Sequence, residues 1–422
     1  MKRSRALFQS ELGEFSDPTA QPNQPVVLPS KLELGSGDLT LDAWGNQKVS
    51  QDFSMFHGMW TYDIPSGLWL ECKNTTEVPL ETNASSVDGM LTITSDSVDR
   101  FRIESRRHAR YQPNRGWHYS ASILLPLTAT GERRFGAFSE QNGFYFEHRG
   151  GESLYACRRT TTTSGGIVTT AACELITIPF AIDFTKGNIY DIQAQWRGVG
   201  NVKFFIGNAA TGDLTLVHTM SLLNTLTGLS VANPALPIAF ECEQTVDPIT
   251  LQCGCVDITS EGGFKENRQL NLVTSEDIVS FTSTETNIVA IRITTTLSTG
   301  LLNTRDIALR RLLYFSSVDA LCAAYLTRDA SLFAGSTWTK LGDGLNFIDF
   351  AVSTDIVFDP LTAGIPKLEY RRVQSNTTEE ISNPDEQYGD FFMTAGDYLV
   401  LTLKGKTGNG EGGATIEWGE EI

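Results

Sequence analysis

The stretch 133–159 constrains the fold of this chain more than any other part of its sequence. Large and small or polar residues alternate in two runs, 133–138 and 143–148, and Asn142-Gly143 lies between them. Alternation with a period of two is typical of a strand, and Asn-Gly tolerates the positive φ of a hairpin turn. The stretch therefore predicts a β-hairpin followed by a third strand, in an antiparallel sheet.

The same alternation recurs in runs on either side of this hairpin. In the run 189–196, Ile192 and Ala194 share one face, and after a turn Val202 and Phe204 repeat the pattern. Two packed antiparallel sheets require strands that are apolar on one face. We therefore predict an all-β protein built as an antiparallel sandwich.

A chain of 422 residues is too long for one core, so we expect two to three domains. The predicted segments are an extended, Pro-containing N-terminal arm (1–38), an aromatic-rich assembly segment (39–91), a jelly-roll sandwich (92–265), a second β unit with one helix (266–356) and a small C-terminal β piece (357–422). The helix is expected at 317–326, where Ser317 can cap the first turn and apolar residues recur at helical spacing.

Composition excludes several classes of partner. A formal charge of −17 argues against nucleic acid, because binding to phosphates needs a basic face. No run approaches the roughly 18–20 apolar residues of a membrane span, and the N-terminus lacks the apolar run of a secretory signal. Seven scattered cysteines fit a chain that folds in a reducing cytoplasm, where most of them act as small buried residues.

Five landmarks carry a resemblance to a known family. They are LTLDAWGNQKVSQDFSMFHG (39–58), RRFGAFSEQNGFYFE (133–147), IYDIQAQWRGVGNVKFFIG (189–207), ALPIAFECE (235–243) and VDITSEGGF (256–264). The run from Phe101 to Phe264 resembles the concanavalin-like jelly-roll module of virion structural proteins from tailed bacteriophages. The resemblance implies a concanavalin-like jelly roll, a place in the virion, and assembly with other virion proteins and with further copies of this chain.

The aromatic-rich segment is the candidate for assembly contacts. Its large apolar side chains must be buried, either on the sandwich or between subunits. The residues assigned to the interface are Trp44, Phe53, Phe56, Trp60 and Trp69. Closed symmetry is usual in oligomers, so we expect a homo-oligomer, for which a trimer is one arrangement. Burial within the protomer is the alternative that the sequence leaves open.

A second candidate site combines aromatic and polar side chains. Arg115, Trp117 and Tyr119 lie within a short span, and sugar sites combine an aromatic face with placed polar groups. Such a site would contact a host-surface glycan. The alternative, which the alternation favours, is that Trp117 and Tyr119 begin a strand and point into the core.

The sequence gives little indication of catalytic or metal-binding residues. Glu241 and Glu243 share a strand face, as a glycosidase pair would, but ordinary amphipathic patterning explains them and predicts a solvated face. Glu147 has no stronger claim. Cys253-Gly-Cys255 lacks the second ligand pair of a structural zinc site. We therefore predict no catalytic residues, no metal and no cofactor.

The sequence thus predicts a structural component of a tailed-phage virion, a decoration, fibre or tail-associated protein that is not an enzyme. Its function would be subunit assembly, and it would be located in the virion. Two alternatives stay open: a carbohydrate-binding adhesin that contacts the host surface, and a depolymerase that uses Glu241 or Glu243.

Overall fold

The computed structural model describes residues 33–34, 37–38 and 52–421, the last with internal gaps. The gaps are residues 66, 75, 79–82, 96–98, 114, 127–129, 152, 163–167, 245–247, 262–267, 276–277, 298–302, 304, 306, 342–346, 360–366, 383–391 and 407. The chain divides into two units, Met1–Val49 and Ser50–Ile422. In the first unit, β1 (Glu33–Leu34) pairs antiparallel with β2 (Gly37–Asp38).

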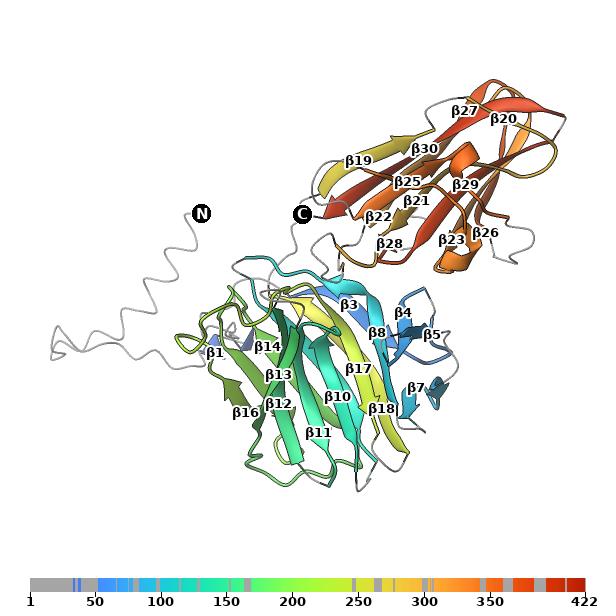
Figure 1. The fold of residues 1–422 in the computed structure, drawn as a ribbon. Helices are drawn as coiled ribbons and strands as arrows, with labels where there is room; N and C mark the ends of the chain where they lie inside the picture. The colour runs from blue at the N-terminus through green and yellow to red at the C-terminus, as the bar shows by residue number, and fades with distance from the viewer. Residues whose placement is uncertain are drawn as a thin grey trace. The chain divides into compact units, whose positions relative to one another are not determined.

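The first sandwich of the second unit is a jelly roll of two eight-stranded antiparallel sheets (Figure 1). The first sheet has the order β13 (Val168–Leu175), β12 (Ser153–Thr162), β11 (Gly143–Arg149), β10 (Glu132–Phe138), β17 (Leu236–Glu243), β8 (Arg100–Ala109), β4 (Trp69–Lys73) and β5 (Thr76–Val78). The second sheet has the order β16 (Leu214–Met220), β15 (Val202–Gly207), β14 (Asn188–Ala194), β9 (Trp117–Leu124), β18 (Ile249–Ser260), β7 (Met90–Ser95) and β6 (Ala84–Val87), with β3 (Phe53–Met59) paired to β18. The predicted all-β, concanavalin-like antiparallel sandwich is confirmed.

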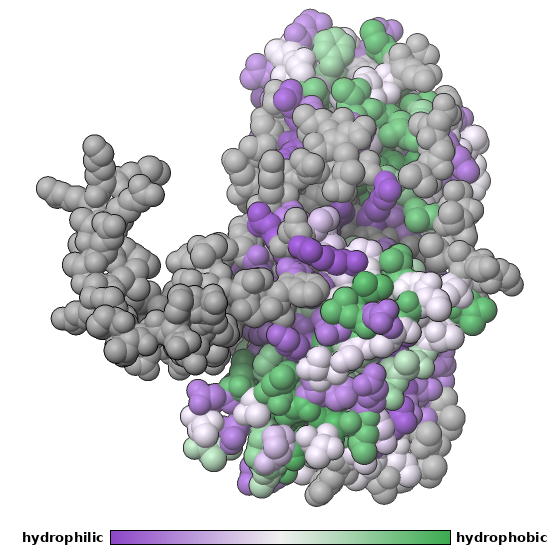
Figure 2. All heavy atoms as spheres, turned by 90° about the vertical axis from the view of Figure 1, so that its left-hand side faces the viewer, coloured by the Kyte–Doolittle hydropathy of each residue, from purple (hydrophilic) through white to green (hydrophobic). Residues whose placement is uncertain are grey.

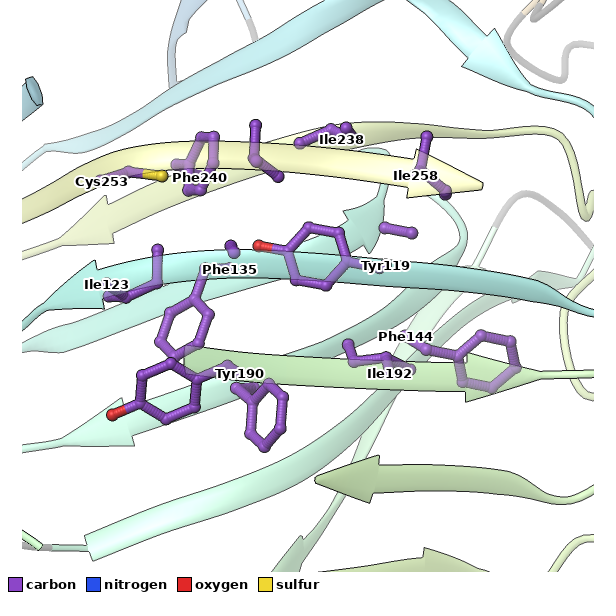
Figure 3. Close-up of a cluster of buried hydrophobic side chains, with 14 of the residues drawn as sticks. Tyr119, Ile123, Phe135, Phe144, Tyr190, Ile192, Ile238, Phe240, Cys253 and Ile258 are labelled. Carbon is purple, nitrogen blue, oxygen red and sulfur yellow. The ribbon is translucent and has the colours of Figure 1, made fainter. Parts of the chain in front are cut away.

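The core of the jelly roll lies between these two sheets and is rich in aromatic side chains. Figure 3 shows residues of both sheets pointing into the same layer, among them Phe135 and Phe240 from the first sheet and Tyr119 and Tyr190 from the second. The rings of Phe135 and Tyr190 meet edge to face, with centroids 4.9 Å apart. Alternation along each strand supplies this layer, as the sequence predicted.

The predicted hairpin forms between β10 and β11. Its connection is the four-residue loop 139–142, and Gly143 already belongs to β11. Gly143 has a φ of +146°, and a Cβ there would lie 2.2 Å from the Cβ of Phe138 across the hairpin. Glycine is therefore required where the two strands approach so closely.

The strands β3 to β6 and the first two residues of β7 come from the segment 39–91 and complete both sheets of the jelly roll. This part of the chain therefore belongs to the jelly roll, and its role in assembly stays a prediction. Trp60 and Trp69 are fully buried and pack against Phe240 of β17. Their large side chains close the apolar layer at this end of the first sheet.

A second sandwich follows, with two six-stranded antiparallel sheets. One has the order β19 (Arg268–Thr274), β30 (Gly410–Glu421), β22 (Ile307–Ser316) and β27 (Thr377–Ser382), with β20 (Val279–Phe281) on β30 and β28 (Phe392–Met393) on β22. The other has the order β24 (Thr339–Lys340), β25 (Ile348–Val352), β21 (Thr286–Ile293), β29 (Tyr398–Gly405), β23 (Ala320–Thr327) and β26 (Lys367–Val373). Because β29 and β30 pair with β21 and β22, the segments 266–356 and 357–422 form one domain instead of two.

The helix predicted at 317–326 was wrong, because most of this segment is the strand β23. The strand lies between β29 and β26, and Ala320, Cys322, Ala324 and Tyr325 are all buried. A strand buried on both faces has a continuous apolar run, which also satisfies helical spacing. The helical elements of the described residues are two short 3-10 turns, Ala330–Phe333 and Ser353–Asp355.

Two of the seven cysteines, Cys157 and Cys173, form a disulfide between β12 and β13. Cys72, Cys242, Cys253 and Cys322 are buried thiols, while Cys255 is exposed. The expectation that most cysteines act as small buried residues thus holds for four of the seven, and the bonded pair and the exposed Cys255 depart from it. Among the helices of the described residues, none has the length and apolarity that crossing a bilayer requires.

Candidate functional site

The strongest concentration of charge that we find lies on the face of the first sheet that points away from the jelly-roll core, which we call the outer face. Along β17, Phe240 and Cys242 belong to the core, so Ala239 and Glu241 project to the outer face. Glu241 nevertheless has no exposed surface. A carboxylate this deeply buried must be paired with cations to remain charged.

A row of alternating charges crosses the sheet at Glu241. Arg102 of β8, Glu241 of β17, Arg134 of β10 and Glu147 of β11 are cross-strand partners in that order. Directly opposite residues on neighbouring strands have their side chains in contact. The register of four strands therefore builds a continuous chain of ion pairs, which we call the charge row.

Arg134 is the centre of the charge row. Its Nη1 donates to Glu241 Oε1 at 2.5 Å and to Glu243 Oε2 at 2.6 Å, and its Nε donates to Glu147 Oε2 at 2.6 Å. Its Nη2 also pairs with Glu132. One guanidinium thus holds carboxylates from three strands together, with Glu147 and Glu241 on different nitrogens.

Glu241 is surrounded by three further arginines. Arg159 of β12 donates to Oε1 at 3.1 Å, whereas Arg102 and Arg100 of β8 approach Oε2 only to 3.6 and 3.9 Å. Among the described residues, Oε2 of Glu241 receives no hydrogen bond. A fully buried carboxylate oxygen without a donor is unusual and marks a position where a hydroxyl or water would bind favourably.

The arginines keep Glu241 ionised. Burial by itself raises the pKa of this carboxyl, but Arg159, Arg134, Arg102 and Arg100 together lower it to about 2. Burial likewise lowers the pKa of the Arg134 guanidinium, and the attraction of Glu241 and Glu147 more than offsets this, so that its pKa is raised.

The rim of this cluster is open to solvent. The side chains of Glu243 and Arg149 are 44% and 42% exposed, whereas those of Glu147 and Arg134 are 3% and 10% exposed. Arg149 also donates to Glu147 Oε1 at 2.5 Å. The outer face therefore has a buried charged centre and an exposed charged rim.

Aromatic rings lie on the same face beside the charges. The guanidinium of Arg159 lies 5.3 Å from the ring centroids of both Phe138 and Tyr145. Arg149 covers the ring of Tyr155 at 4.3 Å. Phe138 and Tyr145 are buried, so of these three rings only that of Tyr155 is partly exposed and could contact a sugar.

The predicted assembly residues are distributed between core and surface. Phe56, Trp60 and Trp69 are buried in the jelly-roll core, as the alternative of burial within the protomer expected, and Phe53 is 45% exposed. Trp44 lies outside the described residues. On the face of the molecule in Figure 2, apolar side chains are interspersed with polar ones. The homo-oligomer and the virion location remain predictions.

The predicted glycan residues do not form a surface site. Trp117 and Tyr119 are buried in the core, where Trp117 packs against Phe144 with ring centroids 6.4 Å apart. Arg115 is partly exposed. The two aromatic side chains therefore stabilise the sandwich, as the structural alternative expected, and have almost no surface to offer a sugar.

The interpretation of Glu241 as part of a solvated strand face was wrong, because its side chain is buried among arginines. Glu147, for which the sequence also indicated no special role, is likewise buried and paired with Arg134. The sequence does contain a signal, since Arg134, Glu147 and Arg159 occupy outward positions in three consecutive strands. Charged residues at such positions must find partners on neighbouring strands.

A smaller polar cluster lies on the second sheet. His118 Nε2 contacts Asp191 Oδ2 at 2.8 Å, and Asp191 is almost fully buried. Burial lowers the pKa of His118, but the hydrogen bond and charge of Asp191, with Asp257, raise it overall. The contact between His118 and Asp191 depends on pH, but this cluster has fewer charged side chains for binding or catalysis than the outer face of the first sheet.

The second sandwich has an open depression of about 280 Å³. Its lining includes Ile278, Leu313, Tyr314 and Phe315, and it contains no carboxylate, histidine or cysteine among the lining residues. It therefore lacks the groups that hydrolysis or metal binding would need, and the candidate site is the outer face of the jelly roll.

Comparisons with known proteins bear on the fold and on the predicted function. No protein-family model and no curated protein matches the chain. Solved structures do match: a laminarinase from Rhodothermus marinus (13% identity, 50% of this chain and 98% of that chain, TM-score 0.37), a glycoside hydrolase family 16 endo-glucanase from Bacteroides ovatus (14%, 48% and 99%, TM-score 0.33) and a β-1,3-glucanase from Mycobacterium marinum (14%, 49% and 98%, TM-score 0.33).

These matches overturn two predictions from the sequence. The similar structures are of glucan-degrading enzymes, so the prediction of a structural virion component, with its adhesin alternative, was wrong, and so was the prediction that the chain is not an enzyme. At such low identity the likeness assigns no role to any residue. The chemistry of the outer face is therefore argued from its own geometry.

Proposed function

We propose that the protein is a carbohydrate-active enzyme in which a polysaccharide binds across the outer face of the first sheet. Glu147 and Glu241 would supply the two carboxyl groups that hydrolysis of a glycosidic bond requires. The observation that carries the proposal is Glu241 itself: it is fully buried and ionised, its Oε2 receives no hydrogen bond from the residues that the structure describes, and the guanidinium of Arg134 lies between it and Glu147.

The open rim supports binding of an extended polar chain. Glu243, Arg149 and the ring of Tyr155 lie at the exposed margin of the cluster and offer charged groups and an aromatic face. A sugar hydroxyl that reached Glu241 Oε2 would satisfy the buried oxygen that lacks a donor. Binding would therefore be driven by hydrogen bonds to this cluster, with the partly exposed ring of Tyr155 against the apolar face of one sugar.

The spacing of the strands indicates the stereochemistry. Glu147 and Glu241 lie on β11 and β17, with β10 between them, so their backbones are about 9–10 Å apart. Both side chains lean toward Arg134, which brings the carboxyl groups closer than that. Inverting glycosidases hold their carboxyl groups about 6.5–9.5 Å apart, whereas retaining enzymes hold them about 5–5.5 Å apart. We propose inversion at the anomeric carbon, because the guanidinium of Arg134 lies between the two carboxyl groups and holds them apart.

The roles of the two carboxyls follow from their surroundings. Glu241 is held ionised and would act as the base that takes a proton from the attacking water. Glu147 would first take up a proton from solvent and then give it to the leaving oxygen. Arg134 occupies the space between them that water and the glycosidic oxygen need. The bound polysaccharide must therefore turn Arg134 away, which would free Glu147 from one of its two arginine partners.

The test is release of reducing ends from a panel of soluble β-glucans, α-glucans, xylans and bacterial capsular polysaccharides. We expect cleavage of at least one substrate, with a loss of at least about a hundredfold in Glu147→Gln and in Glu241→Gln. Glu140→Gln is the matched control, because Glu140 pairs with Arg100 and Arg102 of the same cluster but not with Arg134. Near-UV circular dichroism would confirm that each variant is folded.

Two results would contradict the proposal. One is that the folded wild-type protein releases no reducing ends from any member of the panel. The other is that cleavage survives in both glutamate variants, or is lost equally in Glu140→Gln. The anomeric form of the first product, followed by proton NMR, tests the expected inversion separately.

A further inference from the structure

The disulfide lies beside the charge row. Cys157 of β12 and Cys173 of β13 are directly opposite cross-strand partners with a Cα–Cα distance of 4.1 Å. Glu147 of β11 projects to the same outer face, and its Oε1 lies 3.8 Å from the Sγ of Cys173. The two Sγ atoms and a carboxylate oxygen of Glu147 all lie within 4.8 Å of one another.

Once the sulfur–sulfur bond is broken, these distances are compatible with tetrahedral coordination of a cation by the three side chains. Zinc binds thiolate sulfur at about 2.3 Å and carboxylate oxygen at about 2.0–2.2 Å, so neighbouring ligand atoms in a tetrahedron lie roughly 3.5–3.8 Å apart. The contact from Cys173 to Glu147 already has this length. Reduction would let the two sulfurs separate to the remaining distance by side-chain rotation on β13, a strand at the edge of its sheet.

We propose that the reduced form of the protein binds a thiophilic divalent cation of the zinc type through Cys157, Cys173 and Glu147. Two thiolates and one carboxylate are ligands that zinc accepts, and three protein ligands leave the fourth position for water. This site is distinct from the proposed hydrolytic function, although it uses Glu147.

The surrounding charges favour such a complex. Two thiolates and a carboxylate outweigh the charge of a divalent cation by one, and Arg134 on Glu147 Oε2 compensates for that excess. The cation would replace Arg149 on Oε1. Arg149 can give way because its side chain is 42% exposed and has other contacts, with the ring of Tyr155 and with Glu132.

The redox step needs a named reductant. A phosphine supplies two electrons: the disulfide bond breaks, water provides the oxygen of the phosphine oxide, and its two protons make two thiols. The cation then displaces these two protons as it binds the thiolates. A dithiol reductant would give the same two thiols and itself become a cyclic disulfide.

The experiment is a titration of the full chain with Co²⁺, whose thiolate complexes have a strong charge-transfer absorption, followed by displacement with Zn²⁺. We expect about one Co²⁺ per phosphine-reduced chain and no such absorption from the oxidised chain. Cys157→Ser and Cys173→Ser should abolish the absorption. Glu147→Gln should weaken Co²⁺ binding at least about tenfold.

Cys255→Ser is the matched control, because Cys255 is an exposed thiol close in sequence to Cys253 and would be the rival site. Persistence of the absorption in the Cys157→Ser/Cys173→Ser double variant, or its loss in Cys255→Ser, would overturn the proposal. So would its absence from reduced protein that keeps the circular dichroism of the folded chain. None of these outcomes depends on polysaccharide cleavage, so failure here is distinguishable from failure of the proposed function.

Discussion

Replacing Glu241 by glutamine tests whether the arginines need this buried anion. The substitution keeps the size of the side chain, removes its charge and replaces one acceptor oxygen by a donor amide group. The pKa of Glu241 lies at about 2 instead of 4.5, and a tenfold change in proton affinity is worth about 1.4 kcal/mol. The ionised carboxylate therefore contributes about 3 kcal/mol at neutral pH, within the range for removing one partner of a buried ion pair.

The assay is hydrogen exchange of the amides of β17 and β10, read by mass spectrometry, which separates the jelly roll from the second sandwich. At pH 7 we expect exchange about a hundredfold faster in Glu241→Gln than in the wild type. Glu243→Gln is the control: it removes a carboxylate from the same strand and the same arginine, but one that is 44% exposed, so its cost should stay below about 1 kcal/mol.

The stability that Glu241 contributes should decrease as the pH falls. A carboxyl whose folded pKa is depressed contributes stability that is complete above its unfolded pKa of 4.5 and is lost as the pH falls through about 2. The difference between Glu241→Gln and the wild type should therefore shrink to roughly half by pH 3. Equal costs for the two glutamine variants at pH 7, or a difference that does not change down to pH 3, would refute the reasoning.

Three further perturbations test other parts of the structure. The pKa of His118 is raised in the folded protein, so its contact with Asp191 stabilises the fold fully below pH 6.5 and is lost as the pH rises through the folded pKa. Urea unfolding should therefore show that His118→Gln lowers the free energy of unfolding more at pH 6 than at pH 9. The disulfide between Cys157 and Cys173 closes a loop of 16 residues, and the double serine variant should lose about 3 kcal/mol in thermal unfolding, whereas an unchanged transition would show that the bond does not form. Gly143→Ala should cost more than about 1 kcal/mol in the same measurement, because alanine cannot adopt this φ or fit the close approach across the hairpin; a neutral effect would contradict the strand geometry.

Alternation in the sequence was sufficient to predict the sandwich. Phe204, Ile192 and Ala194 are fully buried, as a period of two required, and the hairpin at 133–147 pairs as expected. The segment 317–326 failed because a strand covered on both faces loses the alternation that distinguishes it from a helix. Domain boundaries failed because β29 and β30 pair with strands that are far away in the sequence.

The candidate site was harder to predict than the fold. Glu241 and Arg134 are 107 residues apart, and only the register of β10 on β17 places them opposite each other. Within its own strand, Glu241 has the position of an ordinary solvated residue. The disulfide depends in the same way on the register of Cys157 against Cys173, which spacing in the sequence does not reveal.

The most direct test of the central claim is a crystal structure of Glu147→Gln with an oligosaccharide from the substrate that the wild type cleaves. We predict density for the sugar across β11, β10 and β17, with a hydroxyl or a water on Glu241 Oε2 and with the Arg134 side chain displaced from its present position. Sugar bound only to another surface of the jelly roll, or to the second sandwich, while Arg134 still joined residue 147 to Glu241, would contradict the account.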